Sequence, residues 1–124
     1  MDRQLKAFDI ILVDFGQEPI DSEQGGIRPA VIVQTDAGNI HSPTTLVMPF
    51  TTKIKHLYQP THTVIKKGSN KGLVLDSMIL GEAMRQISMS SKRVKKYLGR
   101  VTDIEEQNKI INVIKSSVIL EAMQ

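Results

Sequence analysis

The sequence predicts a mainly β domain that ends in a single α-helix. Several short apolar segments are rich in β-branched residues and are separated by Gly, Pro and Asn turn signals. The spacing of apolar residues changes to a helical period only near the C-terminus. At 124 residues, with 40% hydrophobic and 23% charged side chains, the chain fits one domain spanning residues 1–124. These observations indicate a compact barrel or a small twisted sheet, an α+β arrangement dominated by strands.

Four strands are predicted in the first half of the chain. They cover residues 8–15, 29–35, 44–50 and 61–66. The second strand begins at Pro29 and is followed by a turn cluster formed by Asp36, Gly38 and Asn39. The fourth, THTVIK, alternates polar with apolar residues, as a strand with one solvent-facing side does.

The second half predicts the remaining strands. Residues 73–87 form either one bent strand or two, with Gly81 at a bulge or bend. Residues 90–101 are expected to form a short helical turn followed by a last strand. The basic run KRVKK, residues 92–96, is interpreted as a solvated helix face.

The C-terminal segment predicts a helix. Thr102 and Glu105 form a T-x-x-E capping box, in which each side chain satisfies a backbone donor at the helix start. Apolar residues then recur at helical spacing: Ile104, Ile111, Ile114, Val118 and Ala122, widened by Ile110, Val113, Leu120 and Met123. A helix of about 20 residues would pack on the sheet. Two interpretations of its wide apolar stripe stay open: it also contacts a partner subunit, or it only closes the core.

Composition excludes several classes of function. The chain has no cysteine, which excludes disulfides, thiolate catalysis and zinc–thiolate sites. No apolar run approaches the roughly 20 residues that span a bilayer, and the N-terminus does not read as a secretory signal, so we expect a cytoplasmic protein without membrane contact. The net charge of +3 and the pI near 9.3 are compatible with a polyanionic partner, but many other proteins share them.

The stretch DSEQGGIRPAVIV, residues 21–33, is a candidate anion site. Gly25 and Gly26 allow a backbone with positive φ, and successive N–H groups in such a turn can hold an anion. Arg28 adds a forked cation that suits phosphate, and Pro29 stiffens the backbone after it. The alternative is a flexible connection followed by a solvated arginine.

A second stretch, MPFTTKIKH, strengthens the phosphate interpretation. Thr51 and Thr52 end a strand that we expect to pair with the strand beginning at Pro29, since sequential strands often pair. Their hydroxyls could bind a phosphate oxygen, and Lys53 and Lys55 would extend the positive field. Taken alone, a Thr-Thr pair is ordinary strand sequence.

These segments resemble the MazF/PemK family, the toxins of bacterial toxin–antitoxin pairs, also called mRNA interferases. The matching segments are VDF (13–15), SEQGGIRPAVIVQTD (22–36), GN (38–39), SPT (42–44), TT (51–52) and PTH (60–62). The resemblance implies a small SH3-like β-barrel with a C-terminal helix. It also implies a homodimer that cuts single-stranded RNA, such as mRNA, at a short preferred sequence without metal or other cofactor, and that a cognate antitoxin neutralises.

The resemblance also assigns roles by position. Arg28 and Thr51 match the family's principal catalytic pair, and Glu23 matches a loop carboxylate implicated in some members. Ser22 and Gln24 match the substrate-contacting part of the same loop. We add further candidate RNA contacts from charge, backbone exposure and stacking: Gly25, Gly26, Thr52, Lys53, Lys55, Tyr58 and Arg85.

Three positions depart from the family pattern. Asp21 replaces a frequent glycine before the serine, and Phe8 replaces a glycine before the first strand. Ala83 stands where many members have glutamine after an acidic residue, so a base contact is expected to be missing there. The cleavage sequence therefore does not transfer from other members.

Cleavage without a metal uses the substrate's own 2′-OH as the nucleophile and leaves a 2′,3′-cyclic phosphate and a 5′-OH. Arg28 is the candidate for stabilising charge on the phosphoryl oxygens, and Thr51 for orienting a phosphate oxygen or the 2′-OH. Glu23 is a candidate base, although an ordinary glutamate, with a pKa of about 4.3, is a weak one.

The three histidines do not form a metal site in the sequence. His41, His56 and His62 lie in separate segments, and no carboxylate cluster joins them. His62 belongs to the PTH segment, where we interpret it as structural. His56 is interpreted in the same way, with contact to RNA as the less favoured alternative.

The main alternative is a non-catalytic SH3-like barrel that binds nucleic acid or a partner protein, because small barrels host many functions. Such a protein could act as a gyrase poison. It could also be a regulatory toxin–antitoxin component that reaches operator DNA only in complex with the antitoxin. An adjacent reading frame for a small acidic protein with a disordered tail would favour the toxin interpretation.

Overall fold

The computed structural model describes residues 3–16 and 25–119. Its strands are β1 (Asp9–Asp14), β2 (Ile27–Ile32), β3 (Thr44–Thr51), β4 (His62–Ile65), β5 (Ser77–Leu80), β6 (Arg85–Ser88) and β7 (Val94–Arg100). Its helices are α1 (Asp36–His41) and α2 (Ile104–Ser117), with short 3-10 helices η1 (Ser69–Lys71) and η2 (Gly81–Ala83). The predicted strands are confirmed, with ends shifted by a few residues. The segment 73–87 forms two strands, with Gly81 at the bend between them.

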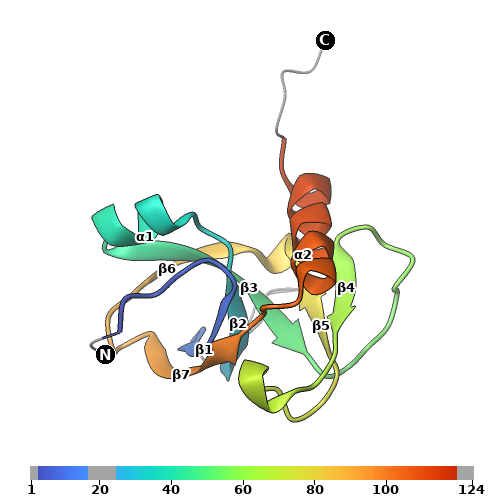
Figure 1. Ribbon diagram of the computed structural model, residues 1–124, viewed down its shortest axis with the longest axis horizontal. Helices are drawn as coiled ribbons and strands as arrows, with labels where there is room; N and C mark the ends of the chain where they lie inside the picture. The colour runs from blue at the N-terminus through green and yellow to red at the C-terminus, as the bar shows by residue number, and fades with distance from the viewer. Residues whose placement is uncertain (1–2, 17–24, 120–124) are drawn as a thin grey trace.

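All the strand pairs in the described residues are antiparallel. The sheet has the order β4-β5-β3-β2-β1-β7, and β6 pairs with β3 beside this path. Strand β3 pairs with three other strands. Its first half pairs with β6, its middle with β2, and its last two residues with β5. The sheet therefore curves around β3 in a barrel-like arrangement without closing (Figure 1).

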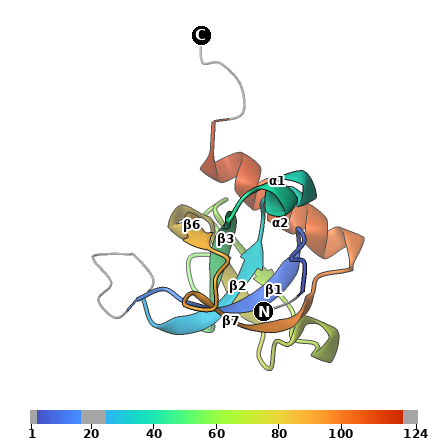
Figure 2. The ribbon, with the colours of Figure 1, turned by 90° about the vertical axis from the view of Figure 1, so that its left-hand side faces the viewer.

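Both faces of the sheet are buried, and each has its own apolar cluster. Along β1 the side chains alternate: Ile10 belongs to one cluster, and Ile11 and Val13 belong to the other. This explains why the first strand is apolar with few breaks, because a strand covered on both sides has no polar face. Helix α2 covers the first cluster with Ile110 and Val113. Figures 1 and 2 show α1 and α2 on the upper side of the molecule, and Figure 1 shows α1 toward its left and α2 toward its right.

The start of α2 differs from the predicted capping box. Asp103, rather than Thr102, is the N-cap: its carboxylate accepts a 2.8 Å hydrogen bond from the backbone N–H of Glu105. Glu106, three residues after the cap, turns inward and is buried. A shift of one residue lets Asp103 cap the helix while Glu106 reaches the core.

The predicted apolar stripe of α2 divides into two faces. Ile110 and Val113 are buried, whereas Ile104, Ile111 and Val118 are exposed by 67%, 37% and 40%. The helix ends at Ser117, and Leu120, Ala122 and Met123 lie outside the described residues. Ile104 and Ile111 lie seven positions apart, which places them on a second face of the helix, and Val118 follows at the C-cap with extended backbone.

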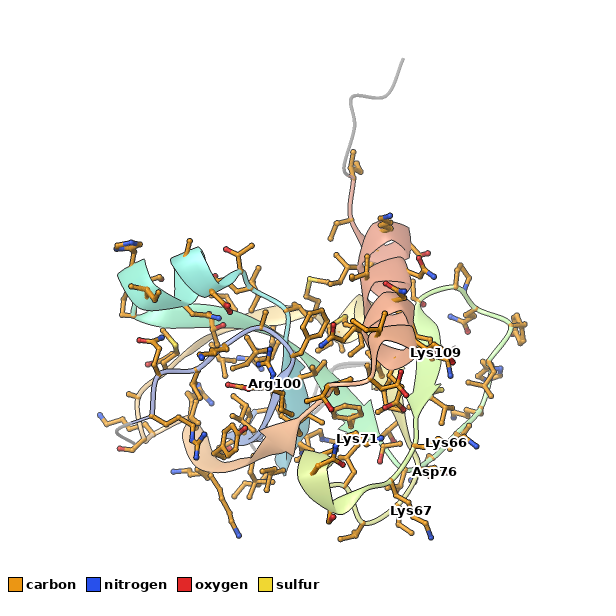
Figure 3. All side chains as sticks on the ribbon, in the orientation of Figure 1. Lys66, Lys67, Lys71, Asp76, Arg100 and Lys109 are labelled. Carbon is orange, nitrogen blue, oxygen red and sulfur yellow. The ribbon has the colours of Figure 1, made fainter. Side chains whose placement is uncertain are left out.

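A buried ion pair fixes α2 to the rest of the fold. Lys71 Nζ donates to Glu106 Oε1 at 2.8 Å, and the backbone N–H of Lys66 donates to Glu106 Oε2 at 3.0 Å. Both side chains of the pair are about nine-tenths buried, with exposed fractions of 10% and 11%. Figure 3 labels Lys71 and Lys66 beneath the first turns of the helix. The pair ties α2 to η1 and to the end of β4, segments that lie far apart in the sequence.

Two further predictions need correction. The turn cluster after residue 35 forms the short helix α1, because Thr35 caps it by accepting a hydrogen bond from Gly38 N at 3.2 Å. The basic run 92–96 is not a helix face: a turn precedes β7, and Val94 already begins that strand. Val94 is buried in the second apolar cluster, and this burial favours the strand conformation for this part of the run.

Candidate functional site

Two backbone hydrogen bonds join the end of β1 to the start of β2, and we call this paired segment, residues 14–16 and 26–27, the stem. The Phe15 N–H donates to Gly26 O at 2.9 Å, and the Gly26 N–H donates to Gly16 O. Gly26 has a φ of 76°, the left-handed conformation that glycine adopts without strain. The loop residues 17–24 lie outside the described residues, and with them the predicted candidates Ser22, Glu23 and Gln24, and the departure at Asp21.

Two arginines hold the end of β1 in this stem. Arg85, from β6, donates to Phe15 O at 3.3 Å, and its guanidinium lies 5.6 Å from the centre of the Phe15 ring. Arg93 donates to Asp14 O at 3.1 Å. Arg85, which we predicted to contact RNA, therefore contacts Phe15 in the stem.

Arg28 lies on β2 directly after the stem. Its side chain is half-buried, and its Nε donates to Gly25 O at 3.0 Å. This bond fixes the guanidinium relative to the backbone of the glycine turn. The stiff presentation expected from Pro29 is thus reinforced by a side-chain contact.

Thr51 is the last residue of β3. It pairs with Met78 of β5, and its hydroxyl accepts a 3.2 Å hydrogen bond from the backbone N–H of Lys53. The register of β2 with β3 sets Ala30 opposite Pro49. The ladder ends at this pair, and Arg28 and Thr51 each lie two residues beyond it along their own strands, at positions that strand alternation assigns to the same face. The predicted catalytic pair thus lies just past the same end of the β2–β3 ladder, but of the two only Thr51 lines the neighbouring cavity.

A cavity of about 380 Å³ opens beside Thr51. Its lining residues come from the end of β3, the following loop, β4, β5 and η2: Thr51, Lys53, Lys55, His56, Gln59, His62, Met78, Leu80 and Glu82. Three predicted site residues, Thr51, Lys53 and Lys55, meet here. Thr52 is exposed but outside the lining, and Tyr58 is 82% exposed.

His62 and Glu82 form a pair inside this cavity. His62 Nε2 lies 2.6 Å from Glu82 Oε1, and His62 Nδ1 lies 3.1 Å from the backbone oxygen of His56. His56 has a φ of 56° and contacts the Tyr58 hydroxyl through its own Nδ1 at 3.3 Å. Sequence reasoning assigned His62 a structural role and did not select Glu82. The one indication in the sequence was that Glu82 occupies the acidic position that precedes glutamine in many family members.

The pKa of Glu82 is lower than that of an ordinary glutamate. Partial burial acts to raise it, but the hydrogen bond from His62 opposes burial, helped by hydrogen bonds from the backbone and from Thr61 and by the charge of His62. The lowering effects together outweigh burial. Glu82 is therefore ionised at neutral pH.

The described residues, 3–16 and 25–119, contain neither a metal-binding cluster nor a helix that could span a membrane. No group of three or more His, Cys, Asp or Glu side chains in this part of the chain could hold a metal ion. No helix in it is long and apolar enough to cross a membrane.

Comparison with known proteins identifies the family. Residues 6–118 match the model of the PemK-like, MazF-like toxins of type II toxin–antitoxin systems. The chain belongs to this family. It is 41% identical over 108 residues to the endoribonuclease MazF of Staphylococcus saprophyticus, a match that covers 85% of this chain and 86% of the relative. The family membership predicted from the sequence is confirmed.

Solved MazF structures share the fold. A mycobacterial endoribonuclease in complex with its cognate antitoxin superposes with a TM-score of 0.73 at 19% identity, covering 96% of this chain and 99% of that one. MazF from Deinococcus radiodurans also gives a TM-score of 0.73 at 19% identity, over 94% of each chain. The predicted fold class, a mainly β MazF/PemK-type barrel with a C-terminal helix, is confirmed.

Proposed function

We propose that this protein is the toxin of a type II toxin–antitoxin pair and acts as a sequence-specific, metal-independent endoribonuclease on single-stranded RNA. Membership of the MazF-like family and 41% identity to an endoribonuclease MazF support the activity. The observation that supports the site is that Thr51 lines a cavity together with Lys53 and Lys55, while Arg28 lies two residues beyond the last β2–β3 pair, Ala30 with Pro49, on the neighbouring strand.

The proposed reaction is an internal transfer at the scissile phosphate. The 2′-OH loses its proton and its oxygen bonds to phosphorus, while the bond to the 5′-oxygen breaks and that oxygen takes up a proton. The products are a 2′,3′-cyclic phosphate and a 5′-OH. Arg28 stabilises the charge that grows on the phosphoryl oxygens, and Thr51 orients a phosphate oxygen or the 2′-OH. Glu23 is our candidate for accepting the first proton.

RNA would bind along the charged side of the cavity. Lys53 and Lys55 line it and attract phosphates, and the exposed Tyr58 offers a ring on which a base can stack. Because binding depends on charge, the affinity for RNA should fall as the salt concentration rises. We assign Ser22, Gln24, Gly25, Gly26 and Thr52 to the same RNA path.

The partners are proposed on the same basis. A relative of similar fold is described in complex with its cognate antitoxin, and we propose an antitoxin partner for this chain. We also propose a homodimer, for which the exposed Ile104 and Ile111 of α2 and Val118 directly after it provide an apolar surface. Operator DNA would be bound only by the toxin–antitoxin complex. The site of action would be the cytoplasm, where mRNA is found.

The test is incubation of the purified protein with a long RNA in EDTA, followed by analysis of the new ends. We expect cleavage at a short recurring sequence, with 2′,3′-cyclic phosphate and 5′-OH ends. Products with 5′-phosphate would contradict the mechanism. RNA that is bound but left intact would instead support a non-catalytic binding barrel.

A further inference from the structure

We propose that Gln59 determines part of the RNA sequence preference: its side-chain amide recognises the edge of one nucleobase that enters the cavity beside Thr51, and it selects a base with an exocyclic amine, adenine or cytosine. This inference rests on the proposed function, because it concerns which RNA sequence the same site accepts. It deepens that function by assigning one base contact to one side chain.

The backbone of Gln59 is held by two consecutive turns. Its N–H donates to His56 O at 3.0 Å, and its carbonyl accepts a 3.0 Å hydrogen bond from the N–H of His62. The first turn begins at His56, which has a left-handed φ of 56°. Pro60 fixes the backbone directly after Gln59. The half-buried side chain is therefore presented from a fixed point of the loop, as a contact that discriminates between ligands requires.

The amide of Gln59 is available to a ligand. It has no hydrogen-bond partner among residues 3–16 and 25–119. In the same residues, every polar side-chain atom that is sealed from solvent does have a partner, so the amide reaches open space in the cavity that Gln59 lines. Among the described residues of this lining, Gln59 is the only one with a side-chain amide, which offers a donor and an acceptor side by side.

The cavity also has an apolar lining, which suits the flat face of a base. Met78 and Leu80 of β5 supply it. Strand β5 pairs with β3 at Met78–Thr51 and with β4 at Leu80–His62, which sets these apolar side chains between the elements that carry the polar ones. The volume of about 380 Å³ lies at the low end of the range of about 300–1,000 Å³ that small-ligand sites span. A single base suits this size and this mixture of groups.

Thr51 connects the cavity with the reaction. In the proposed mechanism its hydroxyl orients a phosphate oxygen or the 2′-OH at the scissile bond, and the same residue lines the cavity. The base recognised by Gln59 therefore belongs to a nucleotide near the cleaved bond.

Glu82 restricts which base edge is favourable. Its side chain lines the same cavity, is 41% exposed, and as a carboxylate can only accept hydrogen bonds. The carbonyl of uracil at C4 or of guanine at C6 would meet this negative charge, whereas adenine and cytosine present an amine at the same position. The Gln59 amide matches that edge with two hydrogen bonds: its carbonyl accepts from the amine, and its NH₂ donates to the adjacent ring nitrogen.

The experiment maps the cleavage sequence of the wild-type protein and of Q59M, which replaces the amide by an apolar side chain of similar length. A long RNA of mixed sequence is cleaved in EDTA, and sequencing of the new 5′-OH ends gives the base preference at each position. We expect the preference for adenine or cytosine at one position to fall by about 5-fold to 150-fold, the discrimination expected of one bidentate base contact. Preferences at the other positions should stay the same.

The matched control is Q86M. Gln86 of β6 donates to Thr44 Oγ1 at 2.7 Å, at the opposite end of β3 from Thr51. Its substitution should leave every base preference unchanged. Thermal unfolding of both variants checks that they fold, and the change at Gln59 removes no hydrogen bond within the described residues.

A second measurement tests the contact itself. In a short oligoribonucleotide, the preferred base is replaced by its analogue without the amine, purine for adenine or pyrimidin-2-one for cytosine. We expect kcat/KM of the wild-type protein to fall by about 5-fold or more, and that of Q59M to fall much less, because a lost partner costs little once the other partner is gone. Equal losses in both proteins would show that the amine does not meet Gln59.

The outcomes separate this inference from the proposed function. RNA cleavage by Q59M with the wild-type base preferences would overturn the role of Gln59 and leave the nuclease intact. A loss of preference that falls on uracil or guanine would overturn it in the same way. Absence of cleavage by the wild-type protein would overturn the nuclease, and this inference with it.

Discussion

Two of the carboxylate pairs in the described residues, one with a lysine and one with a histidine, tie distant segments together, yet they differ in their exposure to solvent. Lys71 and Glu106 are both about nine-tenths buried, and the two Glu106 oxygens are taken by Lys71 and by the backbone of Lys66. His62 is equally buried, but its partner Glu82 is 41% exposed and faces the cavity beside Thr51.

This difference shows which charges can act on a substrate. Both oxygens of Glu106 already accept a hydrogen bond inside the protein, so the effect of this pair is confined to holding α2 on the sheet. Glu82 keeps an open side, and its charge contributes to the field of the cavity. A pair in which both side chains are buried acts only on the stability of the fold, whereas a pair with an exposed carboxylate can also change the affinity for a charged ligand.

The largest expected effect comes from breaking the closed pair. Glu106→Ala leaves the Lys71 ammonium buried without its partner, and removing one member of a buried pair typically costs about 3–5 kcal/mol. We expect the free energy of unfolding to fall by about this amount in urea denaturation. RNA cleavage per folded molecule should stay the same.

The control removes both charges. Lys71→Met combined with Glu106→Leu should recover most of the lost stability, because two apolar side chains leave no unpaired ion. Equal destabilisation of the single and double variants would show that the helix contact itself, and not the unpaired charge, determines the cost.

The next largest effect is expected from Arg28, in the proposed RNA-binding site. Arg28→Ala removes one preorganised donor to the phosphate and should lower kcat by at least about 10²-fold to 10³-fold, equivalent to about 3–4 kcal/mol of barrier. Single-turnover cleavage of an oligoribonucleotide gives the rate. Urea denaturation should show a much smaller loss of stability than Glu106→Ala.

The matched control is Arg28→Lys. It keeps a positive charge but loses the planar fork and the Nε that donates to Gly25 O. An intermediate rate is expected. Full activity of Arg28→Ala would remove Arg28 from the mechanism.

A smaller effect is expected at the N-cap of α2, the helix that the Lys71–Glu106 pair holds on the sheet. Asp103→Ala removes the N-cap of α2 and should cost about 1 kcal/mol of stability. Thr102→Ala should cost less, because the observed cap bond runs from Glu105 N to Asp103. Circular dichroism during thermal unfolding compares the two variants. A larger loss for Thr102→Ala would restore the capping box predicted from the sequence.

The smallest effect is the dependence of stability on Glu82 at acid pH. Its pKa is lower in the folded protein than in the unfolded chain, so it contributes stability that is fully present above the unfolded pKa. That contribution is lost as the pH falls through the folded pKa. Because the side chain is well exposed, solvent screening keeps the effect small.

The measurement compares wild-type protein with Glu82→Gln. The difference in their free energies of unfolding should shrink as the pH falls from about 7 to about 3. A difference that stays constant over this range would mean that ionisation of Glu82 does not contribute to stability.

Sequence reasoning found the strands because each one is a short apolar run ended by a turn signal. It also anticipated that the strand carrying Arg28 pairs with the strand that ends in Thr51, since sequential strands often pair. The face of α2 that packs inward was not predictable in the same way. Ile104 and Ile111 are as apolar as Ile110, and only the position of the sheet decides which of them is buried.

The sequence by itself determined the order of the strands along the chain, the C-terminal helix, the family, and the candidate pair Arg28 and Thr51. These follow from local patterns and short motifs. Only the tertiary structure decided that Glu106 pairs with Lys71, and that His62 joins the loop after β3 to Glu82. Partners 35 and 20 residues apart leave no periodic signal, because their contact depends on how the sheet folds around β3 rather than on their neighbours in the chain.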